Sequence, residues 1–295
     1  MKVLITGAHG LFGTACRTVF SSHGHDIQPL SRQYISDALP RDITERLSAV
    51  DLVIHAAANT NVEQCELKPD DCYRDNFLLT DLVASACAIA KVKLIYMSST
   101  GVYGSYQDEP YFESSKTRPT THYHKAKRLG EKVVLSNSTQ NLVIRTGWLF
   151  GGSFENPKNF VARRLEEATD ASVKGQKLYA NNEQRGCPTY TIDVANRLLQ
   201  LILMGHQGLF NVVNTGQASR LEYVVAIIET AGLHLDVKPA SAIYFNRKAK
   251  VPHNETAVNW RANESGLPEM PTWRSSLKHY VIQQSIRERA KHYDR

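Results

Sequence analysis

The feature that most constrains the fold is a glycine-rich turn near the start of the chain. An apolar run, KVLIT (2–6), precedes Gly7, Gly10 and Gly13, and a helical pattern follows at 11–24. Glycine permits positive φ in a tight turn and lets the backbone approach a phosphate, while the helix N-terminus supplies N–H donors. A strand, a turn and a helix in this order indicate a dinucleotide-binding unit.

The following sequence alternates apolar, β-branched runs with helical stretches. Further strands are expected at 25–31, 51–57, 92–99, 141–147 and 208–214, and further helices at 70–90, 121–137, 190–203 and 219–232. Strands that are apolar throughout and separated by helices indicate a parallel sheet covered on both faces. The expected fold is therefore α/β, a Rossmann-like doubly wound parallel sheet with a smaller C-terminal substrate-binding lobe.

The expected domains are discontinuous in the sequence. The dinucleotide-binding domain comprises residues 1–149 and about 187–215. The substrate-binding lobe comprises about 150–186 and 216–280, and its last part is less regular and rich in Pro, Asn and Trp. Residues 281–295 form a basic C-terminal tail.

Composition excludes several classes of protein. The 295 residues are 42% hydrophobic and 22% charged, as in ordinary globular proteins. No apolar run reaches the roughly 20 residues of a membrane helix, and MKVLITGAHG is better explained as a strand than as a signal peptide, so a cytoplasmic protein without a membrane partner is expected. Five scattered cysteines without a CxxC motif predict reduced thiols and no zinc site.

The net charge of +6 is compatible with two kinds of anionic partner. Lysine and arginine are spread along the chain, and only the tail at 285–295 concentrates them. A nucleic-acid partner would need a clustered basic face, so none is expected. Modest positive charge suits an anionic small substrate or the phosphates of a cofactor.

The end of the second expected strand indicates which dinucleotide binds. NAD sites usually carry an acid there, about twenty residues beyond the glycine turn. This chain has Ser31, Arg32 and Gln33, whereas Asp26 stands at the start of the strand. A guanidinium matches a 2′-phosphate, so NADPH is expected with Arg32 as its contact. NADH, with Arg32 as an ordinary surface charge, remains the alternative.

Three residues near the fourth expected strand suggest carbonyl chemistry. Ser99 stands at the carboxyl end of that strand, where ligands bind in such sheets, and Tyr123 and Lys127 lie one turn apart on the next helix. Tyr-x-x-x-Lys alone is compatible with a plain polar helix face. Beside a nucleotide site, however, Ser99 can orient a carbonyl oxygen, Tyr123 can exchange a proton with it, and the Lys127 ammonium is expected to lower a tyrosine pKa of about 10.

With these features the chain resembles the extended short-chain dehydrogenase/reductases. Within them it is most similar to the dTDP-4-dehydrorhamnose reductase family of nucleotide-sugar 4-ketoreductases. The similarity covers nearly the whole chain and includes TGAHGLFG, VIHAAANTNVEQCE, YHKAKRLGE, RTGWLFG, EQRGCPTY and LPEMPTWRSSL. It implies an NADPH-dependent reductase of a 4-keto nucleotide-activated deoxysugar in nucleotide-sugar or surface polysaccharide biosynthesis. A nucleoside diphosphate sugar is the implied partner, and a homodimer is one expected assembly.

Further site residues are expected from the resemblance and from the loop. The cofactor contacts are Gly7, Gly10, Leu11, Phe12, Gly13, Arg32, Asp42, Ala56, Ala57, Ala58, Asn76, Tyr123 and Lys127. The substrate contacts are Thr100, Trp148, Arg185 and Thr189, and Arg185 is a candidate for the phosphates. The family usually has Asp-Tyr where this chain has Thr100-Gly101, which leaves the sugar open.

Two other functions remain open. The segment SSTGVYG (98–104) also resembles nucleotide-sugar epimerases, which retain NAD, and a non-catalytic regulatory subunit could share the fold. No metal site is predicted, because His122 and His124 point to different faces of their helix. His55 is expected to pack in the core, and Arg145, inside a strand, is expected to form an internal ion pair.

Overall fold

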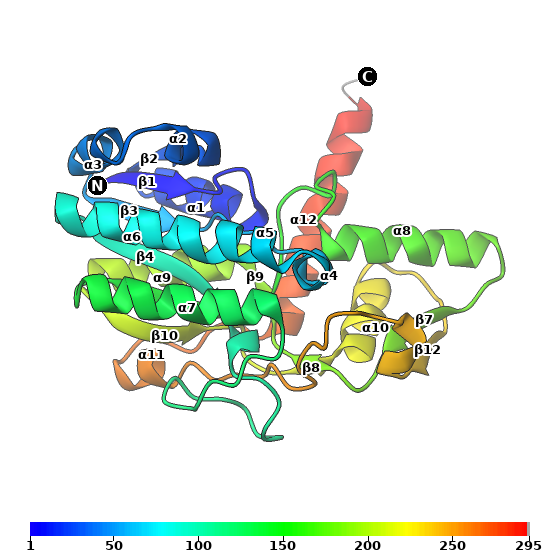
Figure 1. The fold of residues 1–295 in the computed structure, drawn as a ribbon. Coiled ribbons are helices and arrows are strands. Elements are labelled where there is room, and N and C mark those ends of the chain that lie inside the picture. The colour runs from blue at the N-terminus through cyan, green and yellow to red at the C-terminus, as the bar shows by residue number, and fades with distance from the viewer. Residues whose placement is uncertain (294–295) are drawn as a thin grey trace.

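The computed structural model describes residues 1–293, and its centre is a six-stranded sheet (Figure 1). The strand order is β10-β5-β4-β3-β1-β2, and every neighbouring pair is parallel. The strands are β1 (Lys2–Thr6), β2 (Asp26–Leu30), β3 (Leu52–His55), β4 (Lys93–Ser99), β5 (Leu142–Thr146) and β10 (Gly208–Val212). The predicted fold class, a doubly wound parallel sheet, is confirmed.

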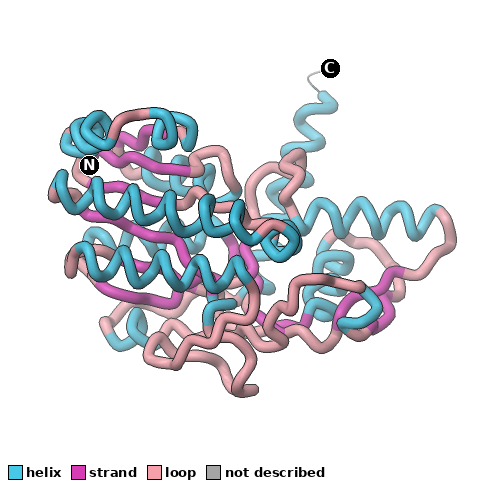
Figure 2. The backbone as a smooth tube through the Cα atoms, viewed as in Figure 1, coloured by secondary structure: helices cyan, strands magenta, loops and turns pink. Residues whose placement is uncertain are grey.

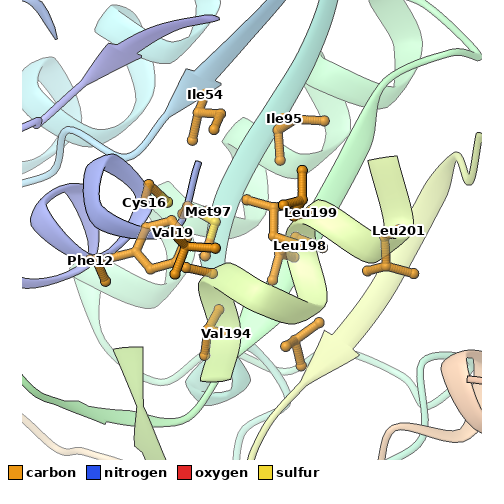
Figure 3. Close-up of a cluster of buried hydrophobic side chains, with 14 of the residues drawn as sticks. Phe12, Cys16, Val19, Ile54, Ile95, Met97, Val194, Leu198, Leu199 and Leu201 are labelled. Carbon is orange, nitrogen blue, oxygen red and sulfur yellow. The ribbon is translucent and has the colours of Figure 1, made fainter. Parts of the chain in front are cut away.

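Helices cover both faces of this sheet, because the strands are apolar on both sides. One face packs against α1 (Leu11–Ser22) and α9 (Thr191–Leu203), and the other against α3 (Pro40–Ser48), α6 (Leu79–Ala90) and α7 (His122–Asn137). Figure 3 shows Phe12 and Val19 of α1 meeting Leu198 of α9 beside Met97 of β4. The carboxyl ends of all six strands therefore open at one edge of the sheet.

The segment between β3 and β4 is more divided than the single helix expected at 70–90. It contains α4 (Val62–Leu67), α5 (Pro69–Tyr73) and the π-helical turn η1 (Arg74–Leu78), which runs into α6. The π turn directs Asp75 and Asn76 into the protein interior, where both are buried. Such turns are common near functional sites.

The loop that follows β4 is long. The 3-10 turn η2 (Thr100–Val102) leads into residues 103–121, which have no helix or strand apart from an isolated bridge at Tyr111 and run along the lower edge of the molecule (Figure 2). Tyr103 and Tyr111 stack with ring centroids 4.7 Å apart, and both are fully buried, so the loop is anchored by its own aromatic core.

A smaller lobe lies beside the carboxyl ends of the strands (Figure 1). It contains α8 (Phe160–Val173), α10 (Arg220–Thr230), and β7 (Leu178–Asn181) paired with β12 (Val237–Ala240). An aromatic core holds it together, with Phe150, Tyr190, Tyr223, Trp273 and Tyr280 in contact. The remaining elements are α2 (Arg32–Asp37), β6 (Trp148–Phe150), β8 (Arg185–Gly186), β9 (Pro188–Tyr190), β11 (Ala218–Ser219), η3 (Ala242–Phe245) and α11 (Trp260–Glu264).

The C-terminal region is more regular than its composition predicted. Helix α12 (Trp273–Tyr293) is continuous for 21 residues and projects away from the body (Figure 1). The predicted start of a separate tail, at residue 281, therefore falls inside this helix, and residues 294–295 of that tail lie outside the described part. No helix within residues 1–293 is long and apolar enough to span a membrane.

Candidate active site

A cavity of about 900 Å³ lies at the carboxyl ends of five strands of the sheet. Its walls come from the segments after β1 and β3 and from the ends of β2, β4 and β5, which is where open α/β sheets bind ligands. The lobe closes the far side with Lys158, Gln184, Arg220, Arg247 and Glu255. The cavity therefore joins the sheet to the lobe.

The glycine turn forms one end of the cavity. Gly7 has φ of 70°, and a Cβ there would lie 2.8 Å from the backbone nitrogen of Ala57. A Cβ on Gly13 would lie 2.1 Å from the carbonyl oxygen of Gly7, so only glycine allows this close packing. Gly10 caps α1 without a side-chain hydrogen bond. The first N–H groups of the helix are thus left for an anion, as a pyrophosphate requires.

The other predicted contacts on this side follow the same wall. Leu11 and Phe12 line the cavity at the start of α1, and Ala56, Ala57 and Ala58 line it after β3. Their small or apolar side chains leave room for a ring system beside the glycine turn.

Arg32 lines the cavity as the first residue of α2 and forms an ion pair with Asp75. Arg46, which no sequence motif identified, also lines it, with its guanidinium carbon 4.9 Å from the ring centroid of Tyr34. Two arginines and a tyrosine therefore stand beyond the end of β2. The spacing from Arg32 to Arg46 gives no signal in the sequence, because separate helices carry the two residues.

Asp42 and Asn76 do not line the cavity, in contrast to the expected cofactor contacts. Asp42 lies in the first turn of α3 and is 3.8 Å from the guanidinium of Arg41. Asn76 is 1% exposed; its Oδ1 accepts the N–H of Asn59 at 2.8 Å, and its Nδ2 donates to the Asn59 carbonyl at 3.1 Å. The π turn places Asn76 behind the wall, where it holds the loop after β3.

Ser99, Tyr123 and Lys127 all line the same cavity. The Oγ of Ser99 accepts the N–H of Gly101 at 3.2 Å, which fixes the hydroxyl at the end of β4. Lys127 is 3% exposed, and its Nζ lies 4.2 Å from the ring centroid of Tyr96. The structure therefore brings the three predicted catalytic residues to one surface.

The electrostatics of this group differ from the expectation. Burial raises the pKa of Tyr123, and burial lowers the pKa of Lys127 to about 7, with Glu131 opposing the shift. The expected lowering of the tyrosine pKa by Lys127 is not found, because burial and the nearby Cys65, Cys72 and Glu255 all raise the pKa of Tyr123. A protonated Tyr123 is nevertheless the form that can donate a proton to a carbonyl oxygen.

His124 is a cavity residue that the sequence analysis considered only as a metal ligand. Its Nδ1 lies 2.9 Å from the Oγ1 of Thr121, and burial lowers its pKa to about 3, so the ring is neutral. Thr121 Oγ1 already accepts the N–H of His124, so its own proton is free for Nδ1. This leaves the ring proton on Nε2. A Cβ on Gly101 would lie 2.1 Å from that Nε2.

Trp148 lines the lobe side of the cavity at the start of β6 and is 8% exposed. The guanidinium carbon of Arg220 stacks 3.4 Å from its ring centroid, and Gly186 lies against the ring, where a Cβ would be 2.4 Å away. Burial lowers the pKa of Arg220 to about 10, so it stays charged at neutral pH. Burial raises the pKa of Glu255, which accepts a hydrogen bond from Gln184 at 3.0 Å.

Three predicted substrate contacts lie outside the cavity lining. Arg185 is bonded instead to Asp108, with Nη2 3.1 Å from Oδ1, because the loop after β4 passes its side of β8. Thr189 is fully buried and donates to the Cys187 carbonyl at 2.9 Å. Thr100 is fully buried in η2. The cations that line the cavity in place of Arg185 are Lys158, Arg220 and Arg247. Tertiary packing, not a sequence motif, brings these three residues together.

The remaining predictions concern histidine, cysteine and metal. His55 is fully buried between Thr6 and Thr80, with ring nitrogens 2.8 and 3.0 Å from their hydroxyls, which confirms its packing role. All five cysteines are free thiols and buried. Within the part of the chain that the structure describes, no group of three or more His, Cys, Asp and Glu side chains could hold a metal.

Sequence comparisons identify proteins that are similar to this chain over most of its length. The family described as "RmlD substrate binding domain" matches residues 1–286. The dTDP-4-dehydrorhamnose reductase of Mycolicibacterium smegmatis is 31% identical over 95% of this chain and 85% of its own length. The spore coat polysaccharide biosynthesis protein SpsK of Bacillus subtilis is 28% identical over 96% of this chain and 98% of its own.

A solved structure extends the similarity to three dimensions. The dTDP-4-dehydrorhamnose reductase of Bacillus anthracis, determined in complex with NADP, superposes with a TM-score of 0.88 at 26% identity, over 96% of this chain and 99% of that one. The match over residues 1–286 and the agreement in fold lead to one conclusion: the chain belongs to the RmlD family, the dTDP-4-dehydrorhamnose reductase-like branch of the extended short-chain dehydrogenase/reductases.

Proposed function

We propose that the protein is an NADPH-dependent reductase of a 4-keto nucleotide-activated deoxysugar, similar to dTDP-4-dehydrorhamnose reductase. One observation carries the proposal: a single cavity contains the glycine turn, the Ser99–Tyr123–Lys127 group and the three lobe cations. Relatives named as dTDP-sugar reductases support the same class of oxidoreductase and the same kind of biosynthesis. The NADP-bound neighbour supports the cofactor.

The cofactor would be held at the glycine end of the cavity. The N–H groups at the start of α1 face the pyrophosphate, and Arg32 with Arg46 receives the 2′-phosphate. Arg32 then exchanges its ion pair with Asp75 for the phosphate. When bound, the reduced nicotinamide supplies a hydride to the carbonyl carbon of the sugar.

The chain itself would supply the proton and the orientation. Tyr123, kept protonated by burial, donates its phenolic proton to the carbonyl oxygen. Ser99 donates a hydrogen bond to the same oxygen, keeps its own proton and aligns the carbonyl. Lys127 lies one turn beyond Tyr123, and its ammonium stabilises the phenolate that remains.

The nucleoside diphosphate would bind at the lobe. Lys158, Arg220 and Arg247 line this end of the cavity, whereas Glu255 is an acid whose pKa burial raises. Glu63 also lies 3.7 Å from the Arg247 guanidinium, but the three cations outnumber these two acids, so the two phosphates of the substrate supply the balancing charge. Trp148, held flat between Arg220 and Gly186, forms a wall of the sugar site.

A cofactor titration followed by a substrate panel tests the proposal. Quenching of tryptophan fluorescence should show NADPH binding at least tenfold more tightly than NADH, and Arg32→Ala should remove most of that preference. The protein should then oxidise NADPH only with a 4-keto nucleotide sugar. Purified protein that carries tightly bound NAD and binds no added NADPH would instead indicate an epimerase.

We also infer a cytoplasmic location, a homodimer and a division into a dinucleotide-binding domain and a substrate-binding lobe. The resemblance supports all three inferences. Light scattering of the purified protein measures its mass in solution. A homodimer should have twice the mass of the 33.1 kDa chain.

A further inference from the structure

A second cavity, of about 700 Å³, shares no lining residue with the active-site cavity. It lies where residues 113–118 of the long loop meet α7, the sheet edge at β5 and β10, and α11. Figure 1 shows α7, β10 and α11 close together at the lower side of the sheet. Nothing in the proposed reaction uses this cavity.

Positive charge dominates its lining. The cationic side chains are Lys116, Arg118, Arg128, Arg145 and Arg261. Glu113 is the only acid among the described lining residues. Its Oε1 already accepts the N–H of Asn211 at 3.0 Å, and burial raises its pKa. Behind the lining, Glu131 pairs with both Arg128 and Arg145, at 3.0 and 2.7 Å. The five cations still outnumber these two acids, so the cavity keeps a net positive charge.

Arg145 is the most buried cation of this cavity. The residue is 2% exposed, and its Nε and Nη2 donate to Glu131 at 2.8 and 2.7 Å. Its guanidinium also interacts with Tyr103, and the guanidinium carbon lies 4.6 Å from the ring centroid of that tyrosine. Arg145 is therefore engaged by its own neighbours, and contacts to an anion would come from the more accessible cations of the lining.

Cations and an aromatic ring are also available nearer to solvent. Lys116 and Arg118 are exposed, and the Arg118 guanidinium carbon lies 4.7 Å from the ring centroid of Tyr106. Trp260, in the first turn of α11, is 48% exposed although it lines the cavity. An exposed tryptophan beside arginine and lysine offers a surface on which a nucleobase can stack.

We propose that this cavity is a second binding site for a nucleotide, separate from the active site. The phosphates would contact Lys116, Arg118 and Arg128, and the base would stack on Trp260. The long loop thus has a binding role of its own, because residues 113–118 form one wall of the site.

Fluorescence of Trp260 provides the readout. The background is Trp148→Phe, which removes the reporter in the active site, while Trp273 stays buried in the lobe core. In this background ADP should quench the fluorescence saturably, and Trp260→Phe should abolish the response. Inorganic pyrophosphate should compete with ADP but bind less tightly. Pyrophosphate that binds as tightly as ADP would overturn the role of the ring.

Charge reversal tests the phosphate contacts. The double variant Lys116→Glu/Arg118→Glu should weaken ADP binding at least tenfold. Lys132→Glu, an equally exposed change on α7 outside the cavity, should stay within twofold. Calorimetry should count one more ADP site in Lys132→Glu than in the double variant. Equal affinity and equal site number in the two proteins would overturn the proposal.

Discussion

At the residue scale, Gly101 and His124 depend on each other. The resemblance implies a tyrosine at the position of Gly101, but the His124 ring leaves no room for a side chain there, because its Nε2 would lie 2.1 Å from a Cβ. The sequence shows the departure at Thr100-Gly101 but not what replaces the missing side chain, because 23 positions separate the two residues. His124 itself lines the active-site cavity.

Gly101→Ala should therefore destabilise the fold by about 1–3 kcal/mol, the usual cost of overpacking. His124→Ala alone should also cost stability, because it removes a buried ring. The double variant Gly101→Ala/His124→Ala should lose less stability than the two single losses added together. The smaller side chain at position 124 makes room for the methyl group at position 101. Urea unfolding of the four proteins measures this coupling, and strictly additive effects would show that the two residues do not share the space.

Lys127 should make stability depend on pH. Its pKa is lowered from 10.5 to about 7 by burial, so between these values the unfolded chain binds a proton that the folded chain has lost. The free energy of unfolding should therefore rise with pH in this window, by up to about 1.4 kcal/mol per unit, and below pH 7 the contribution should be constant.

The comparison with Lys127→Met isolates this contribution. Other groups, including Tyr123 and the cysteines, titrate in both proteins, so they cancel in the difference between wild type and variant. Urea unfolding between pH 7.5 and pH 9 should show wild type gaining stability relative to Lys127→Met. A difference that stays flat across this range would mean that Lys127 keeps its ordinary pKa.

At the element scale, α7 positions the reacting groups through one buried acid. Tyr123, Lys127 and Glu131 recur at four-residue intervals along the helix, so they share a face. Glu131 is fully buried and accepts hydrogen bonds from Arg145 of β5 and from Ser98 of β4, at 2.6 Å from the serine Oγ. The predicted internal ion pair of Arg145 is thereby confirmed, although the sequence did not identify its partner.

Glu131→Gln should destabilise the protein by about 3–5 kcal/mol, because it leaves the buried guanidinium of Arg145 without its countercharge. It should also lower kcat, since Ser98 precedes Ser99 on β4. Glu229→Gln, on the exposed face of α10, is the matched control and should change stability by less than about 0.5 kcal/mol. If Glu131→Gln lost as little stability as the control variant, α7 would be held in place by other contacts.

The sequence predicted the elements of the sheet better than those of the lobe. Strands such as β1 and β5 are apolar on both faces, and only a buried parallel sheet explains that pattern. Helix α8 was missed because most of its buried residues are alanines, which give a weak apolar signal, and α12 was missed because its apolar residues form no clear stripe. Helix α12 mixes exposed Ile282 with buried Leu277 and Tyr280, since only its first part packs on the lobe.

At the scale of the whole molecule, the cavity has two basic ends with different partners. Arg32 and Arg46 stand at the glycine end, and Lys158, Arg220 and Arg247 stand at the lobe end. The local motifs identified the glycine turn and the Ser99–Tyr123–Lys127 group because those residues lie at strand ends or within one helical turn. The lobe cations come from segments up to 89 positions apart (247 − 158), so only the folded chain assembles them.

The two ends should respond separately to mutation. Lys158→Met/Arg247→Met should raise KM for the nucleotide sugar about tenfold or more, from the loss of charged hydrogen bonds to phosphate, while the affinity for NADPH stays within twofold. Lys177→Met, also exposed on the lobe, is the control and should change neither. Steady-state kinetics and cofactor titration measure both quantities, and a parallel loss of NADPH affinity would contradict separate ends.

The central claim is that Tyr123 donates the proton in a reduction that consumes NADPH. The most direct measurement mixes the protein, NADPH and a dTDP-4-keto-6-deoxysugar and follows the absorbance of NADPH in wild type and in Tyr123→Phe. We expect turnover in wild type, and a loss of at least 100-fold in kcat for Tyr123→Phe with NADPH affinity retained. Turnover of Tyr123→Phe within a few-fold of wild type would contradict the account.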